Sequence, residues 1–158
     1  MTGSDRDRRA GTDGPDAAAE RRRTVAAAFA VVVLVASVLP IPAAPSGGCG
    51  GGTVGGVGRA VVDAFPAAIG VTGPFHFLGY AVLAALLVRA IGRERRVVAV
   101  AMAVTAATAV GFGIELVQAP IPWRSFAWSD AAVNAVGAVL GASVSALRRR
   151  RSGERTAA

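Results

Sequence analysis

The sequence predicts an all-α membrane protein, a bundle of four transmembrane helices with both chain termini in the cytoplasm. Three observations lead to this fold class. Hydrophobic residues make up 53% of the 158 residues, and the mean hydropathy is +0.52. The apolar residues gather in four long stretches separated by polar segments. The net charge of +7 is distributed unequally between alternate connecting segments.

Each apolar stretch is close to the length that a membrane-spanning helix requires. The four cover residues 24–45, 74–91, 97–117 and 131–147, and a helix needs about 20 apolar residues to cross the hydrocarbon core. None shows the alternation of apolar and polar residues that is typical of a transmembrane β-strand. A helix also satisfies all its backbone hydrogen bonds internally, as lipid demands. We therefore expect one four-span domain over residues 24–147.

The charge indicates how the spans are oriented. Segments 1–23, 89–96 and 148–158 carry net charges of +1, +3 and +4 and lie on one side of a four-span chain. The remaining charged residues sum to −1 on the other side. Because Arg accumulates in cytoplasmic segments, both termini are expected in the cytoplasm, within a multi-pass protein of the cell membrane. Residues 1–23 lack hydrophobic periodicity and are expected to be a disordered tail, and residues 148–158 a basic tail.

Composition excludes several functional classes. The pI near 11.5 would suit a nucleic-acid-binding protein, but only 6% of the residues are aromatic and the chain is dominated by Ala and Val. The lipid bilayer is therefore the expected partner, rather than nucleic acid. The single cysteine, Cys49, rules out an internal disulfide and a Cys-based zinc site. Nothing in the sequence calls for a cofactor or a metal.

Three of the predicted spans carry polar residues at helical spacing. An ionisable side chain at mid-depth in a membrane costs about 2.5–3.5 kcal/mol, so these stripes are expected to face one another inside the bundle. At 1.5 Å per residue, most of their polar members fall in or near the outer third of the membrane. The stripes contain His76 and Tyr80 on the second span, Thr108, Glu115 and Gln118 on the third, and Asp130 and Asn134 on the fourth.

An outward-facing polar pocket follows from these positions, with Arg124 reaching it from the last loop between Trp123 and Trp128. The candidate catalytic residues are His76, Glu115 and Asp130, because imidazole and carboxylate groups exchange protons. The candidate ligand-binding residues are Tyr80, Gln118, Arg124 and Asn134. Structural roles remain open for several of them. Ser129 or Asp130 is a possible helix cap, and Arg124 a possible ion-pair partner that neutralises Glu115 or Asp130. Gln118 and Asn134 are possible interhelical hydrogen-bonding groups, and Gly137-x-x-x-Gly141 is a possible helix-packing motif.

The same residues resemble a known family. His76-Phe77-x-x-Tyr80-x-x-Leu83, Gly113-Ile114-Glu115-x-x-Gln118 and Pro122-x-Arg124, followed by Asp130-x-x-x-Asn134-x-x-Gly137, are similar to the VanZ-like membrane family. The resemblance covers residues 74–141 directly. It implies a four-span membrane fold and an association with the cell envelope, and it supplies no established reaction. Where the family commonly has Asp-Lys before the His segment, this chain has Thr72-Gly73.

The sequence is compatible with several functions. The first is a protein that binds a lipid-linked or anionic envelope molecule in the outer pocket without converting it. The second is a small intramembrane enzyme in which His76 or Glu115 is the general acid or base and Arg124 holds an anionic group. The third is a purely structural protein whose polar groups only hold the bundle together. A transporter is less favoured, since the four spans contain no obvious inverted repeat.

Overall fold

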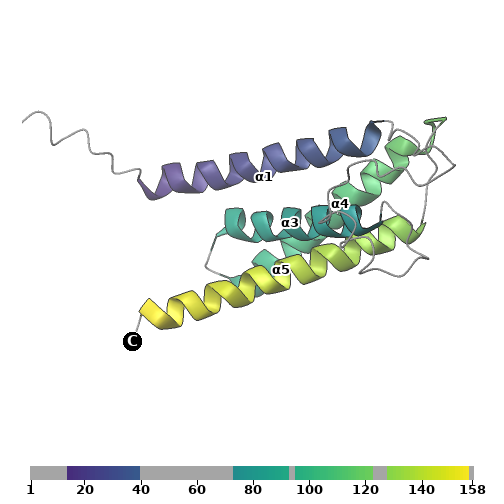
Figure 1. The fold of residues 1–158 in the computed structure, drawn as a ribbon. Coiled ribbons are helices and arrows are strands. Elements are labelled where there is room, and N and C mark those ends of the chain that lie inside the picture. Colours follow the sequence, from purple (N-terminus) through teal and green to yellow (C-terminus); the bar gives the residue numbers. More distant parts are fainter. Residues whose placement is uncertain (1–13, 40–72, 93–94, 123–127, 157–158) are drawn as a thin grey trace, which may run out of the picture.

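The computed structural model describes residues 14–39, 73–92, 95–122 and 128–156. Within them the chain forms four α-helices, α1 (Pro15–Val38), α3 (Gly73–Ile91), α4 (Arg96–Gln118) and α5 (Trp128–Thr156). Helices that follow one another along the chain run in opposite directions, so their ends meet at two opposite ends of the molecule (Figure 1). The described residues are thus all-helical, as the sequence predicts.

Helices α3, α4 and α5 are long and apolar enough to cross a membrane, judged by length and composition. Their large apolar side chains also face outward in numbers that a water-soluble bundle would not tolerate. Val97 is 81% exposed, and Met102 and Val139 are about half exposed. Small side chains such as Ala103, in contrast, fill the interior. The chain is therefore a multi-pass helical membrane protein.

Helix α1 differs from the expected first span. It begins at Pro15, nine residues before the apolar stretch, and ends at Val38. The expectation of disorder was therefore wrong for residues 15–23. Proline is favourable in the first turn of a helix, Asp16 complements the positive end of the helix dipole, and the alanines that follow are strong helix formers. Residues 1–13 and 40–45 lie outside the described residues.

Helix α5 extends the predicted fourth span at both ends. It begins at Trp128 and continues through the basic segment to Thr156, so the described part of the expected C-terminal tail is helical. Arg and Glu have high helix propensity, and Arg150 pairs with Glu154 at 3.6 Å, one turn apart. Because the helix starts at Trp128, Asp130 lies within its first turn rather than at the capping position.

The closest helix pair is α3 and α5, and glycines allow their approach. A Cβ atom added to Gly137 or Gly141 would overlap the backbone of Phe77 or Ala81 on α3. The predicted packing role of Gly137-x-x-x-Gly141 is thereby confirmed. Farther along the same contact, Ser145 Oγ donates a hydrogen bond to the carbonyl oxygen of Ala85 at 3.2 Å. These contacts hold α3 and α5 in one register.

Candidate functional site

The polar stripes meet at the end of the bundle where α3 and α5 begin and α4 ends (Figure 1). Their inward orientation is confirmed. Glu115, Gln118 and Asn134 are buried, and His76 and Asp130 are half-buried. Helical periodicity explains this arrangement, because residues three or four positions apart share one face of a helix. Exposure of these polar side chains to lipid is unfavourable, so that face of each helix packs toward the neighbouring helices.

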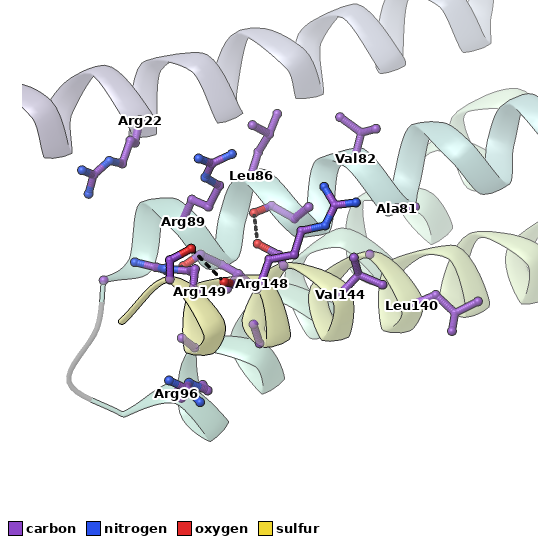
Figure 2. A pocket seen from close by; sticks show the side chains of 18 of the residues that line it. Arg22, Ala81, Val82, Leu86, Arg89, Arg96, Leu140, Val144, Arg148 and Arg149 are labelled. Atoms are coloured by element: carbon purple, nitrogen blue, oxygen red, sulfur yellow. Dashed lines mark hydrogen bonds between the residues drawn. The ribbon is translucent and has the colours of Figure 1, made fainter. Parts of the chain in front are cut away.

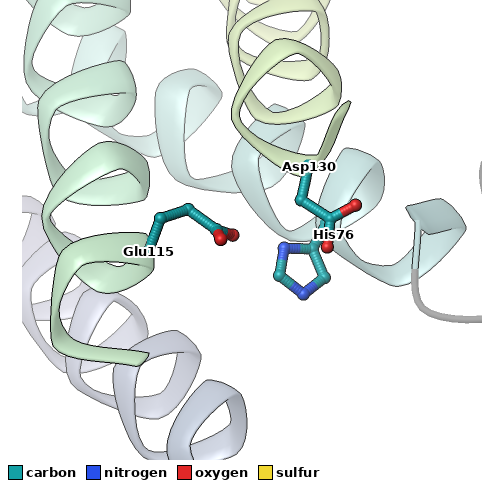
Figure 3. A group of neighbouring side chains, drawn as sticks. All are labelled: His76, Glu115 and Asp130. Atoms are coloured by element: carbon teal, nitrogen blue, oxygen red, sulfur yellow. The ribbon is translucent and has the colours of Figure 1, made fainter. Parts of the chain in front are cut away.

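Three titratable side chains from three helices converge at this end. One ligand atom each of His76, Glu115 and Asp130 lies within 4.8 Å of the other two, and Figure 3 shows the side chains pointing toward one another. Glu115 is 1% exposed, so its carboxyl group is held away from bulk solvent. The structure thus brings together the three residues that the sequence singled out as catalytic candidates, although their function stays a prediction.

His76 also contacts a fourth candidate. Its Nδ1 lies 3.3 Å from Oδ1 of Asn134, a group that can only accept a hydrogen bond. The tautomer with a proton on Nδ1 satisfies this contact and leaves the Nε2 lone pair free to accept a proton or bind a cation. The Tyr80 ring lies one helical turn farther along α3, with its centroid 6.4 Å from that of His76. Asn134 therefore orients the imidazole.

Two buried donors beside the cluster lack a hydrogen-bond partner within the described residues. They are the hydroxyl group of Tyr80 and Nδ2 of Asn134, and both side chains are 1% exposed. A buried donor without a partner costs about 1–3 kcal/mol, so such groups in a native protein generally serve a bound molecule or water. Gly111 faces both side chains, and a Cβ atom there would lie 3.1 Å from each.

Gln118 forms its hydrogen bond with helix α1 rather than with His76, Glu115 or Asp130. Its Nε2 donates a 2.6 Å buried hydrogen bond to the carbonyl oxygen of Ser37, near the end of α1. The bond supports the structural alternative for Gln118, since it joins α1 to α4. Sequence reasoning missed Ser37, because only a backbone carbonyl takes part and any residue carries one. Arg124 and Trp123 lie outside the described residues, so their expected roles stay predictions.

The donor set suits two kinds of chemistry. One imidazole and two carboxylates are ligands that Zn²⁺ and Mn²⁺ accept, and 4.8 Å between ligand atoms is a separation that small side-chain movements can close around an ion. The same groups can move a proton to or from a bound molecule. The sequence alone called for no metal, whereas the convergence of these three side chains makes a divalent cation chemically reasonable.

Comparison with known proteins finds no relative of this chain. No family model, no curated protein and no solved structure matches the chain. What the chain does must therefore be inferred from its own residues.

Proposed function

We propose that this chain is a VanZ-like membrane protein that binds a lipid-linked or anionic molecule of the cell envelope in an outward-facing polar site. The observation that carries the proposal is the convergence of His76, Glu115 and Asp130 within 4.8 Å at one end of an otherwise apolar bundle. Ionisable groups inside a membrane are costly and generally mark a functional site.

Charge supports the orientation that this function requires. Arg22 lies toward the start of α1, Arg89 near the end of α3 and Arg148 in the last third of α5. These helix ends lie opposite to the end that carries the candidate site (Figure 1). By the preference of Arg for the cytoplasmic side, the candidate site faces outward. In the proposed topology α1 is a span in addition to α3, α4 and α5, the first along the chain, and both termini are cytoplasmic.

The motif residues support the family assignment. The VanZ-like pattern contributes His76 and Tyr80 from α3, Glu115 from α4, and Asp130 and Asn134 from α5. Residues that are far apart in the sequence lie together at one site in the fold, as expected if the pattern describes one functional unit rather than three separate coincidences.

The chemistry of the site suits a ligand with phosphate or hydroxyl groups. The Tyr80 hydroxyl and Asn134 Nδ2 are buried donors that an acceptor oxygen entering the cluster would satisfy, while the carboxylates accept from hydroxyl groups. A ligand with an apolar anchor would reach this site through the surrounding bilayer, because the outer surfaces of α3, α4 and α5 are apolar.

Lipid analysis of the purified protein tests the proposal. The protein is purified in mild detergent, incubated with a total envelope lipid extract, and its bound lipids are identified by mass spectrometry. Wild type should retain a polyprenyl- or lipid-linked phosphate compound that Glu115→Gln loses. Glu154→Gln, which removes an exposed carboxylate of α5, is the matched control and should retain it. Identical bound lipids in all three proteins would refute the proposed site.

A second candidate function is that of a small intramembrane enzyme. The short distances between His76 and the two carboxylates favour it, since proton transfer requires acidic and basic groups close together. Incubating the retained compound with wild type, His76→Gln and Glu115→Gln and following its mass distinguishes the two. Conversion by wild type alone supports the enzyme, and unchanged compound in every sample supports binding without turnover.

A further inference from the structure

A large groove extends from Phe77, the residue that follows His76 on α3, to the end of the bundle opposite the candidate site. It runs along α3 and α5 and is closed on one side by Arg22 of α1, with a volume of about 1430 Å³ (Figure 2). Pockets for drug-sized molecules generally occupy about 300–1,000 Å³, so this groove suits a larger occupant. None of the side chains in the candidate functional site lines it.

The lining of the groove is amphipathic. Its walls are apolar over most of their length, with side chains such as Leu86 of α3 and Val144 of α5. Its other end is strongly cationic and carries arginines from all four helices. These are Arg22, Arg89, Arg96, Arg148 and Arg149. The described lining contains no carboxylate, so this charge is not neutralised within the groove itself.

The arginines differ in how far they are already engaged. Arg149 donates a 2.7 Å hydrogen bond to the carbonyl oxygen of Val88, which joins α5 to the last turn of α3. Arg22, Arg89 and Arg148 are exposed and form no ion pair within the described residues. In Figure 2, Arg22 of α1 and Arg89 of α3 lie in the space between these two helices. They are thus available to an anion.

The length of the groove matches one leaflet of a membrane. Phe77 and Arg89 both line it and lie twelve positions apart on α3, which is about 18 Å along a helix. One leaflet contributes about half of the ~30 Å hydrocarbon core. A lipid whose phosphate lies at the arginines would therefore extend its acyl chain along the apolar walls toward the middle of the bilayer.

We propose that this groove binds one anionic phospholipid, with its phosphate against Arg22, Arg89 and Arg148 and an acyl chain lying in the groove along the surfaces of α3 and α5. Basic pockets between transmembrane helices are suited to anionic headgroups. A soluble phosphate would use only the cationic end and leave the apolar walls uncovered, which favours a lipid. The assignment to the cytoplasmic leaflet rests on the topology under the proposed function, whereas the binding itself does not.

Lipid titration followed by native mass spectrometry tests this proposal on the full chain in detergent. Phosphatidylglycerol should bind with one-to-one stoichiometry, and zwitterionic phosphatidylcholine much more weakly. The triple variant R22Q/R89Q/R148Q should bind phosphatidylglycerol about 100-fold more weakly, because each basic residue near an anionic headgroup contributes roughly a fivefold factor. The control R95Q/R151Q/R155Q removes the same charge from exposed positions outside the groove and should change the affinity less than fivefold.

A second pair of variants tests the acyl-chain part without changing the charge. Val144 lines the groove, whereas Val139 lies on the same helix outside it, and both side chains are 47% exposed. Val144→Trp should obstruct the acyl chain and weaken phosphatidylglycerol binding at least tenfold, while Val139→Trp should leave it unchanged. This pair remains informative if the triple arginine variant does not fold.

Three results would overturn the proposal. The first is equal weakening by both arginine triple variants, which would indicate a general charge effect. The second is phosphatidylcholine binding as strong as phosphatidylglycerol binding. The third is complete displacement of phosphatidylglycerol by millimolar inorganic phosphate, which would assign the site to a free anion. Glu115→Gln should leave phosphatidylglycerol binding intact. A loss of ligand binding at the outer site can therefore be distinguished from a loss of lipid binding in this groove.

Discussion

Gly141→Ala is the sharpest test of how this bundle is held together. The added Cβ would overlap the carbonyl group of Ala81 on α3, a backbone group that cannot rotate away as a side chain can. Helix α5 would have to move away from α3. Overpacking of this kind costs about 1–3 kcal/mol. The movement would also stretch the 3.2 Å hydrogen bond from Ser145 to Ala85 one turn farther along, and such interhelical bonds contribute about 0.6 kcal/mol on average. The preference of Ala over Gly inside a helix offsets about 1 kcal/mol of this cost. The expected net loss of stability is therefore about 1–3 kcal/mol.

The matched control is Gly113→Ala on α4, where a Cβ atom would meet nothing within 4 Å. Alanine is favoured over glycine inside a helix by about 1 kcal/mol, so this variant should be slightly more stable than wild type. Stability is measured by reversible SDS unfolding of the detergent-solubilised protein, followed by far-UV circular dichroism. If Gly141→Ala is as stable as Gly113→Ala, the close approach of α3 and α5 is not what stabilises the bundle, and the reasoning fails.

The remaining predictions concern the site, the α1 contact and the topology. Zn²⁺ should raise the melting temperature of wild type, because the ion would bind His76 and the two carboxylates. The melting temperature of Glu115→Gln should rise much less, and both are measured by thermal unfolding in detergent. Equal shifts would argue against a cation there. Gln118→Leu should destabilise the protein by about 1–2 kcal/mol in the same SDS assay, since it removes the buried hydrogen bond to Ser37. An unchanged unfolding midpoint would contradict that role. Cys49, the only thiol, should react with an impermeant maleimide in intact cells, and labelling only after lysis would contradict the proposed topology.

The helices could largely be predicted from the sequence because their signal is local. The apolar stretches at 74–91 and 97–117 correspond to α3 and α4 within one residue at each end. The boundaries of α1 and α5 were less predictable, because both helices continue into charged segments. The apolar residues define the limits of the segment that contacts lipid, whereas helix propensity decides the limits of the helix itself. Those two limits differ wherever Ala, Arg and Glu follow an apolar run.

Helical spacing predicts which residues of the candidate site share one face of a helix. Residues four apart, such as His76 and Tyr80 or Asp130 and Asn134, must share a face of one helix, and lipid forces that face inward. The sequence by itself therefore determined the all-helical membrane class and the residues that face the interior. Which interior residues touch depends on the rotation and register of each helix against its neighbours, and only the tertiary structure decided that. It joined Asn134 to His76, gave Gln118 a bond to α1, and created the arginine-lined groove, because those contacts arise between helices that are distant in the chain.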